Sequence, residues 1–108
     1  MSSFDEQVYT LVKQVPAGKV TTYKALAQAI GTKAYQAVGQ ALKRNPRAPI
    51  VPCHRVVSSD GSVGGFRGSS RSSTVNQKIQ LLQQEGVRVV KGKVQGFEEL
   101  LLTQFTIV

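Results

Sequence analysis

The stretch Ile50-Val51-Pro52-Cys53-His54-Arg55-Val56-Val57 holds the only cysteine and the only histidine of the chain, side by side. Cysteine supplies a soft nucleophile, and histidine is the side chain that titrates near neutral pH. Because apolar residues flank the pair, the pattern indicates a site rather than a surface loop. The structural alternative is that Cys53 is a small buried hydrophobic residue and His54 a satisfied polar group. Composition alone favours the structural alternative, so the choice between the two depends on the rest of the chain.

The residues before this stretch predict three helices. Ser3 can cap a first helix, which has apolar residues at helical spacing. Thr21 or Thr22 then caps a second helix, Tyr23 to Ile30, and Gly31 closes it in the left-handed conformation. A third helix is expected from about Lys33 to Arg44. Two short helices joined by a tight glycine turn are typical of a helix-turn-helix.

The residues after the stretch predict a small β element and one more helix. Val56-Val57 is expected to be a short strand, and Val63 to Ser73 a glycine- and serine-rich loop that faces a ligand or is merely flexible. A last clear helix begins at Thr74 and runs to about Glu85. Val87 to Val90 is expected to be a strand with a pairing strand after a turn, and the pattern of 97–102 fits either helix or strand. We therefore predict a small α/β fold in a single domain, 1–108, with a winged-helix-like helix-turn-helix, three to four helices and a small β element.

Composition restricts the partners and the compartment. Fourteen Lys and Arg residues against six Asp and Glu give a net charge of +8 and a pI near 10.1, which favours a polyanion such as nucleic acid. No apolar run is long enough for a membrane span, and the N-terminus has no secretion signal, so no membrane partner is expected. A single cysteine excludes an intrachain disulfide and suits a cytoplasmic or nuclear location. One Cys and one His cannot form a zinc site alone.

Several segments in a fixed order give the chain a more specific resemblance. They are Gly18-Lys19-Val20-Thr21-Thr22-Tyr23, Ala37-Val38-Gly39-Gln40-Ala41, Asn45-Pro46, Pro52-Cys53-His54-Arg55, Asp60 to Phe66 and Leu81 to Gly86. With these segments the chain resembles the C-terminal DNA-binding and catalytic domain of the O6-alkylguanine-DNA alkyltransferases, standing alone. The resemblance implies DNA repair by transfer of an alkyl group from O6 of guanine to Cys53, once per protein molecule. It implies no cofactor and no metal, and we expect a monomer that binds double-stranded DNA containing alkylated guanine through the minor groove.

The resemblance assigns a role to each matched residue of the reaction centre. Cys53 is the nucleophile, and because an ordinary thiol has a pKa of about 8.5 it needs a base. His54 acts as that base through a bound water, and Glu85 orients the imidazole. Tyr23 helps protonate the departing guanine. Asn45 ties the helix-turn-helix to the active-site turn.

The resemblance also implies how the flipped-out base and the DNA are held. The carbonyls of Cys53 and Val56 accept from the guanine amino group, the N–H of Arg67 donates to O6, and Phe66 forms a wall of the pocket. The residues expected on DNA are Thr22, Tyr35, Gln36, Ala37, Gly39, Lys43 and Arg55.

Two departures from the family pattern affect these expectations. Gln36 stands where most members carry an arginine finger that fills the gap left by the flipped base, and Tyr35 can take this wedging role instead. The segment from Gly68 to Lys78 is also a few residues longer than usual.

Two further functional classes compete with the enzyme. Alkyltransferase-like proteins share the single-domain form, bind alkylated DNA without reacting and recruit other repair factors, but they usually replace the cysteine. Cys53 therefore favours the enzyme. The third reading, a helix-turn-helix regulator with a structural cysteine, predicts sequence-specific binding, whereas the repair readings predict mostly phosphate-driven, salt-sensitive binding.

Overall fold

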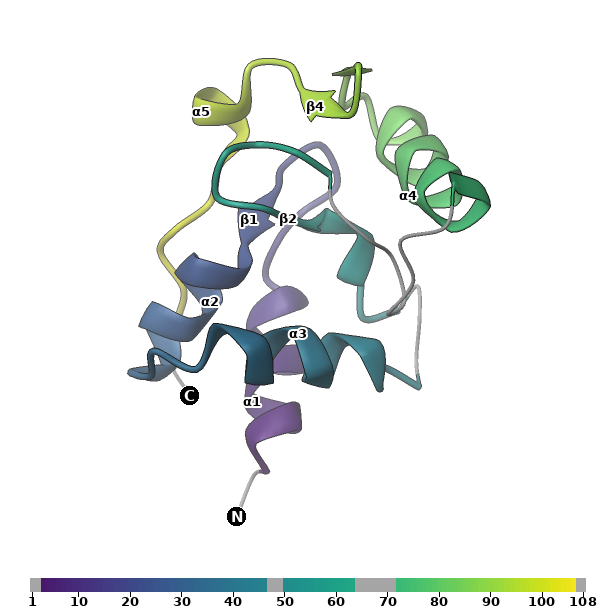
Figure 1. Ribbon diagram of the computed structural model, residues 1–108. Coiled ribbons are helices and arrows are strands. Elements are labelled where there is room, and N and C mark those ends of the chain that lie inside the picture. Colours follow the sequence, from purple (N-terminus) through teal and green to yellow (C-terminus); the bar gives the residue numbers. More distant parts are fainter. Residues whose placement is uncertain (1–2, 47–49, 64–71, 107–108) are drawn as a thin grey trace.

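The computed structural model describes residues 3–46, 50–63 and 72–106, and it confirms the α/β class (Figure 1). The elements, in chain order, are α1 (Phe4–Val12), β1 (Thr21–Thr22), α2 (Tyr23–Ile30), α3 (Tyr35–Lys43), the 3₁₀ turn η1 (Cys53–Arg55), β2 (Val56–Val57), α4 (Ser72–Gln84), β3 (Val89–Val90), β4 (Lys93–Val94) and α5 (Phe97–Leu100).

Helices α1, α2 and α3 pack together around one apolar core. Their inward side chains include Val8, Val12, Leu26, Val38 and Leu42, all of them buried. This core extends to the stretch Ile50–Val57, called the reactive stretch below, because Cys53 and Val56 belong to the same cluster. The three helices therefore form the platform on which the cysteine lies.

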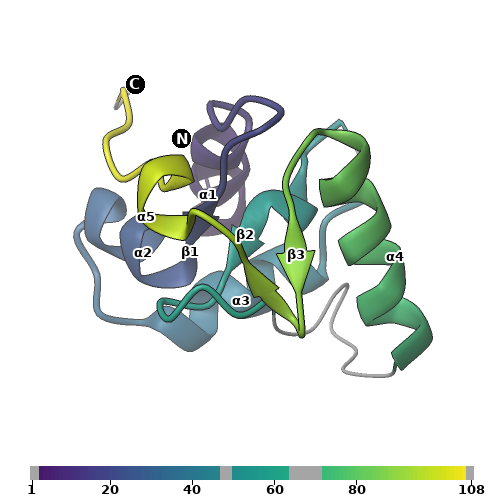
Figure 2. The same ribbon diagram turned by 90° about the horizontal axis from the view of Figure 1, so that it is seen from above.

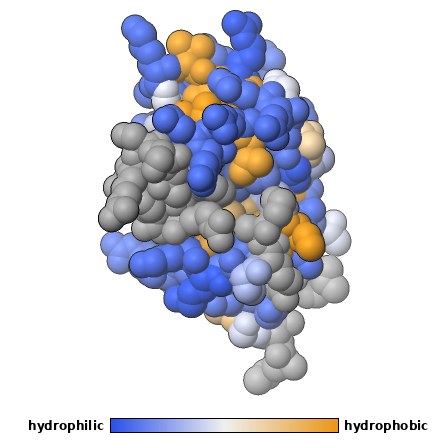
Figure 3. Space-filling model, turned by 90° about the vertical axis from the view of Figure 1, so that its right-hand side faces the viewer, coloured by the Kyte–Doolittle hydropathy of each residue, from blue (hydrophilic) through white to orange (hydrophobic). Residues whose placement is uncertain are grey.

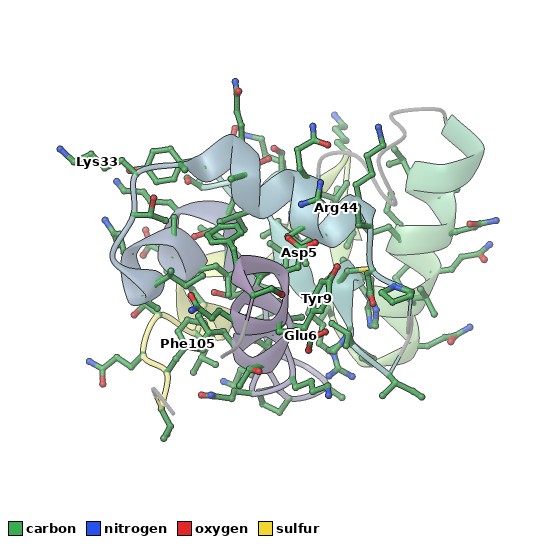
Figure 4. All side chains as sticks on the ribbon, turned by 90° about the horizontal axis from the view of Figure 1, so that it is seen from below. Asp5, Glu6, Tyr9, Lys33, Arg44 and Phe105 are labelled. Atoms are coloured by element: carbon green, nitrogen blue, oxygen red, sulfur yellow. The ribbon has the colours of Figure 1, made fainter. Side chains whose placement is uncertain are left out.

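A charged pair fastens α1 to the end of α3 (Figure 4). Arg44 Nε and Nη2 each donate to a carboxylate oxygen of Asp5 at 2.8 Å, a bidentate contact that fixes geometry as well as charge. The guanidinium lowers the pKa of the Asp5 carboxyl below its ordinary value. Lys33, by contrast, projects away from the body of the molecule at the start of the third-helix segment.

The expected helix-turn-helix pair is present. The Thr22 hydroxyl caps α2 by accepting from the N–H of Ala25 at 3.0 Å, as the sequence predicts. Gly31 ends the helix with φ 90°, a conformation that is costly for other residues. Helix α3 begins at Tyr35, two residues after the expected start near Lys33, and its N-cap residue Ala34 makes no side-chain cap.

Two small sheets lie on the other side of the reactive stretch (Figure 2). Strand β1 pairs with β2 in parallel, with Thr21 opposite Val56, and β3 pairs with β4 in an antiparallel hairpin. A second core cluster, which includes Val20, Val57, Leu82 and Val94, joins these strands to α4. The cysteine and histidine therefore lie between two cores.

Three segments have a state or a start that the sequence pattern does not predict. Residues 53–55 form a 3₁₀ turn. Helix α4 begins at Ser72, so part of the long segment Gly68–Lys78 is helical. The stretch 97–102, which fits either state by pattern, forms α5 and then a bridge from Leu101 to Val20. With α5, the described residues contain five α-helices.

The side of the molecule that carries α4 is mainly hydrophilic, with small apolar patches among polar atoms (Figure 3). Among residues 75–84 of α4, the exposed side chains are amides: Asn76, Gln77, Gln80, Gln83 and Gln84. Among the described residues, no helix has the length and apolar character that a membrane crossing requires.

Candidate active site

A tight turn holds Cys53 and His54 inside the molecule. The N–H of Cys53 donates to the carbonyl of Val51 at 2.8 Å, and the N–H of Arg55 donates to that of Pro52 at 2.9 Å. Cys53 is 7% exposed and His54 is 3% exposed. The short turn thus places a free thiol and an imidazole at the junction of the helical platform and β2.

His54 is paired with Glu85, which follows the end of α4. Its Nε2 lies 3.0 Å from Glu85 Oε2. A carboxylate only accepts, so Nε2 carries the proton and Nδ1 keeps a lone pair. Burial lowers the pKa of His54 below 6.5, although the bond to Glu85 opposes that shift. The imidazole is therefore neutral near pH 7 and can take up a proton at Nδ1.

Arg55 is the second partner of Glu85. Its Nε donates to Glu85 Oε1 at 3.0 Å, and its Nη1 donates to the carbonyl of Val15 at 2.8 Å. Partial burial would raise the pKa of the Glu85 carboxyl, but the bonds from Arg55 and His54 outweigh it and lower that pKa. This engagement differs from the DNA contact expected of Arg55: its guanidinium fixes the carboxylate that holds His54.

Tyr23 and Asn45 approach the same turn from the helix-turn-helix. Tyr23 opens α2 and packs against the core cluster that contains Cys53. Burial raises the pKa of the Tyr23 hydroxyl, and the nearby Cys53 adds to that effect. Asn45, just beyond α3, donates from Nδ2 to the carbonyl of Val51 at 2.9 Å. The expected tie between the third helix and the active-site turn is thus formed by a side-chain hydrogen bond.

Lys78 of α4 lies beside the site and was not expected there. It is 1% exposed, and its Nζ donates to the carbonyl of Val56 at 2.7 Å and to that of Val63. Burial lowers the pKa of Lys78 from 10.5 to about 8, and the nearby Cys53 opposes the shift. A signal for this burial exists in the sequence, because Lys78 shares the helical spacing of Val75, Ile79 and Leu82.

The residues expected on DNA fall into exposed and enclosed groups. Tyr35 is 43% exposed, Gln36 and Lys43 are exposed, and Ala37 and Gly39 are partly buried along the same helix. The Thr22 side chain is only 5% exposed because it caps α2. Phe66 and Arg67 lie outside the described residues.

A free thiol beside a histidine–glutamate pair, next to a helix-turn-helix, defines a candidate DNA-binding domain with a cysteine at its centre. The family model "6-O-methylguanine DNA methyltransferase, DNA binding domain" matches residues 3–87. The chain belongs to this family.

Known relatives support the assignment over most of the chain. A methylated-DNA–protein-cysteine methyltransferase of Saccharolobus islandicus is 43% identical over 86 residues, which are 80% of this chain and 52% of that protein. The O6-methylguanine-DNA methyltransferase of Pyrococcus kodakaraensis superposes with a TM-score of 0.66 and 43% identity, covering 81% of this chain and 48% of that one. The chain thus spans about half the length of these relatives.

A further solved structure is similar over its whole length. Atl1 of S. pombe, crystallised with damaged DNA containing O6-carboxymethylguanine, superposes with a TM-score of 0.80 and 29% identity. The superposition covers 96% of this chain and 100% of Atl1. The matched half of the P. kodakaraensis methyltransferase and the whole Atl1 chain therefore share this fold.

Replacing Asn45 with alanine removes its bond to the Val51 carbonyl. Because Val51 is buried and its carbonyl would still keep the bond from the Cys53 N–H, loss of the Asn45 bond should lower the free energy of unfolding by about 1 kcal/mol, measured by urea denaturation. Asn76→Ala, on the exposed side of α4, is the matched control and should change it by less than about 0.5 kcal/mol. Equal losses in the two variants would show that the tie contributes nothing.

Proposed function

We propose that this protein repairs DNA by moving an alkyl group, such as methyl, from O6 of guanine to Cys53. The observation that carries the proposal is a cysteine at position 53 next to a histidine whose Nε2 is held by Glu85 at 3.0 Å. Membership of the 6-O-methylguanine DNA methyltransferase family supports the same reaction. The alternative of a merely structural Cys53 does not account for the adjoining base and its carboxylate.

In the proposed reaction the thiol proton passes through a water to Nδ1 of His54. The sulfur then attacks the alkyl carbon, an S–C bond forms, and the C–O6 bond breaks with its electron pair going to guanine. Tyr23 protonates the departing base; its pKa lies above the ordinary tyrosine value, so the hydroxyl carries its proton when the reaction begins. Glu85 stabilises the imidazolium that results. The thioether formed at Cys53 has no route back to a thiol, so each molecule reacts once.

The target guanine must leave the duplex to reach a cysteine that is 7% exposed. Helix α3 is the expected DNA contact, with Tyr35 and Gln36 exposed in its first turn. We assign Tyr35, the larger of the two, to the gap left by the base, and Gln36 to hydrogen bonding beside it. Gly39 fits this contact too: a Cβ there would meet nothing within 4 Å, so no packing inside the protein requires a glycine. Lys43 supplies charge for the phosphates.

The flipped guanine is bound, in this proposal, by backbone groups and an aromatic wall. The carbonyls of Cys53 and Val56 accept from its amino group. The N–H of Arg67 and the ring of Phe66 keep their predicted roles at O6 and at the pocket wall.

A second candidate is a non-reacting sensor of alkylated DNA. The likeness to Atl1, with 100% of that chain covered, supports it, since the alkyltransferase-like class has this single-domain form. Cys53 separates the candidates, because a sensor has no need of a nucleophile.

The test is a nucleoside analysis of DNA after reaction. A duplex with one O6-methylguanine is incubated with increasing protein, digested and quantified. The proposal predicts that O6-methylguanine disappears in a one-to-one ratio to protein and guanine appears in its place. Tight binding of the damaged duplex with O6-methylguanine unchanged would establish the sensor.

The pH dependence of the transfer rate tests His54. Only neutral His54 has a lone pair to accept the thiol proton, and burial lowers its pKa below 6.5. The rate should therefore persist at pH 6.5 and fall with a midpoint below it. Since an unfolded histidine binds a proton at higher pH than the folded one, stability should also decrease as pH drops through the window below 6.5. Single-turnover rates across this range check the first point, and a midpoint above 6.5 would contradict it.

A further inference from the structure

Lys78 has the least expected environment of any described residue. It is 1% exposed, although lysine is usually a solvated side chain. Its Nζ donates to two backbone carbonyls, Val56 O and Val63 O. Enclosing a cation there opposes folding, and the lowered pKa of Lys78 reflects that cost. A residue retained at such a cost is a candidate for a role in the site.

The first of these acceptors belongs to the reactive stretch. Val56 follows η1 directly and opens β2, so its carbonyl lies three residues from the nucleophile in the chain. The second acceptor, Val63 O, lies beyond the turn at Asp60 and accepts a hydrogen bond from the same ammonium. Lys78 therefore fixes the Val56 carbonyl against α4 and against the strand segment that returns from that turn.

We propose that Lys78 is a positioning residue for recognition of the guanine amino group, acting through the carbonyl of Val56. This inference rests on the proposed function. A carbonyl oxygen has two lone pairs, so Val56 O can accept from the ammonium and from an exocyclic amine at once. Lys78 contributes by fixing the position of the Val56 carbonyl. It does not make that oxygen a stronger acceptor, because two donors on one oxygen compete for its electron density.

The proposal makes a prediction that a purely structural lysine does not. O6-methylhypoxanthine is O6-methylguanine without the amino group at C2. If Lys78 acts through Val56 O on that amino group, its loss should weaken binding of the guanine base and leave the hypoxanthine base almost unaffected. A lysine that only supports the fold, or that only tunes the thiol, should affect both bases equally.

The experiment measures dissociation constants for three duplexes, carrying O6-methylguanine, O6-methylhypoxanthine or unmodified guanine. All proteins carry Cys53→Ala, so no transfer disturbs the equilibrium. The parent should bind the methylguanine duplex about 10-fold more tightly than the methylhypoxanthine duplex, because the amino group donates to the carbonyls of Cys53 and Val56. Adding Lys78→Met should reduce this ratio to about 3-fold, since the Cys53 carbonyl still accepts, and Lys78→Arg, which keeps a cation and its donors, should restore part of it.

Lys93→Met is the matched control, because it also removes one positive charge but from an exposed position on β4. It should keep the 10-fold ratio even if both affinities decrease through charge. An equal loss for the two alkylated bases in Lys78→Met would overturn the proposal, as would a parent that does not distinguish them. If circular dichroism shows that neither Lys78 variant folds, Lys78 is a core residue and the proposal is also overturned. Failure of the proposed function looks different: the parent would then bind neither alkylated duplex better than the unmodified one.

Discussion

Cys53→Ala should abolish alkyl transfer and leave binding of the alkylated duplex nearly intact. Loss of the nucleophile from an enzyme that forms a covalent product lowers the rate by on the order of 10⁶-fold, so no transfer should be measurable. The thiol is small and lies at the edge of the helical core, so alanine should cost little stability. Transfer is measured as methyl on protein, and binding as the dissociation constant for the O6-methylguanine duplex.

Measuring both transfer and binding in Cys53→Ala separates a loss of chemistry from a loss of structure. If transfer survives in Cys53→Ala, the reaction uses another group and the mechanism is wrong. If transfer and binding are both lost together with the folded signal in circular dichroism, the variant reports on structure alone. Cys53→Ser then repeats the test, since it keeps a polar side chain of nearly the same size and a much weaker nucleophile.

Glu85→Gln should give the second-largest effect, a decrease of about 10²- to 10⁴-fold in the single-turnover rate. The amide can donate to Nε2 of His54, which would move the ring proton to Nδ1 and remove the lone pair that accepts the thiol proton. It also removes the negative charge that stabilises the imidazolium. The fold should persist, because Arg55 keeps its bond to the Val15 carbonyl and an amide oxygen remains as acceptor.

Glu98→Gln is the matched control for this variant, since it makes the same change of charge at an exposed position on α5. Its rate should equal that of the wild type. A wild-type rate in Glu85→Gln would show that the 3.0 Å contact with His54 has no part in the chemistry.

Local chemistry made much of the fold predictable from the sequence. Thr21 or Thr22 was expected to cap the start of the second helix and Gly31 its end; Thr22 and Gly31 do so. Each of these signals depends on residues within a few positions along the chain. The stretch 97–102 could not be assigned by pattern. Its state depends on a distant partner, since Leu101 bridges to Val20 at the other end of the chain.

The candidate site was predictable where the family resemblance implied a contact between residues that are far apart in the chain. The contact between His54 and Glu85 joins residues 31 positions apart, and no periodicity reveals it. The two partners of the Arg55 side chain, Glu85 and Val15, could not be predicted from the sequence. They lie 30 and 40 positions away from Arg55, in opposite directions along the chain.

Lys78 was overlooked for a different physical reason. Lysine is normally a solvated side chain, so its place on the apolar spacing of α4 does not by itself predict burial. The carbonyls that make its burial tolerable belong to β2 and to Val63, which the helical pattern does not contain. A charged residue within an apolar spacing is the signal that would have identified it.

The central claim is that Cys53 itself receives the alkyl group, and intact mass with peptide mapping tests it most directly. Wild-type protein is incubated with an equimolar duplex that carries one O6-methylguanine, and both products are analysed. The account predicts that the protein gains the mass of one methylene, entirely on the peptide containing Cys53, and that a second addition of duplex adds nothing. An unchanged protein mass under conditions where the damaged duplex is fully bound would contradict it.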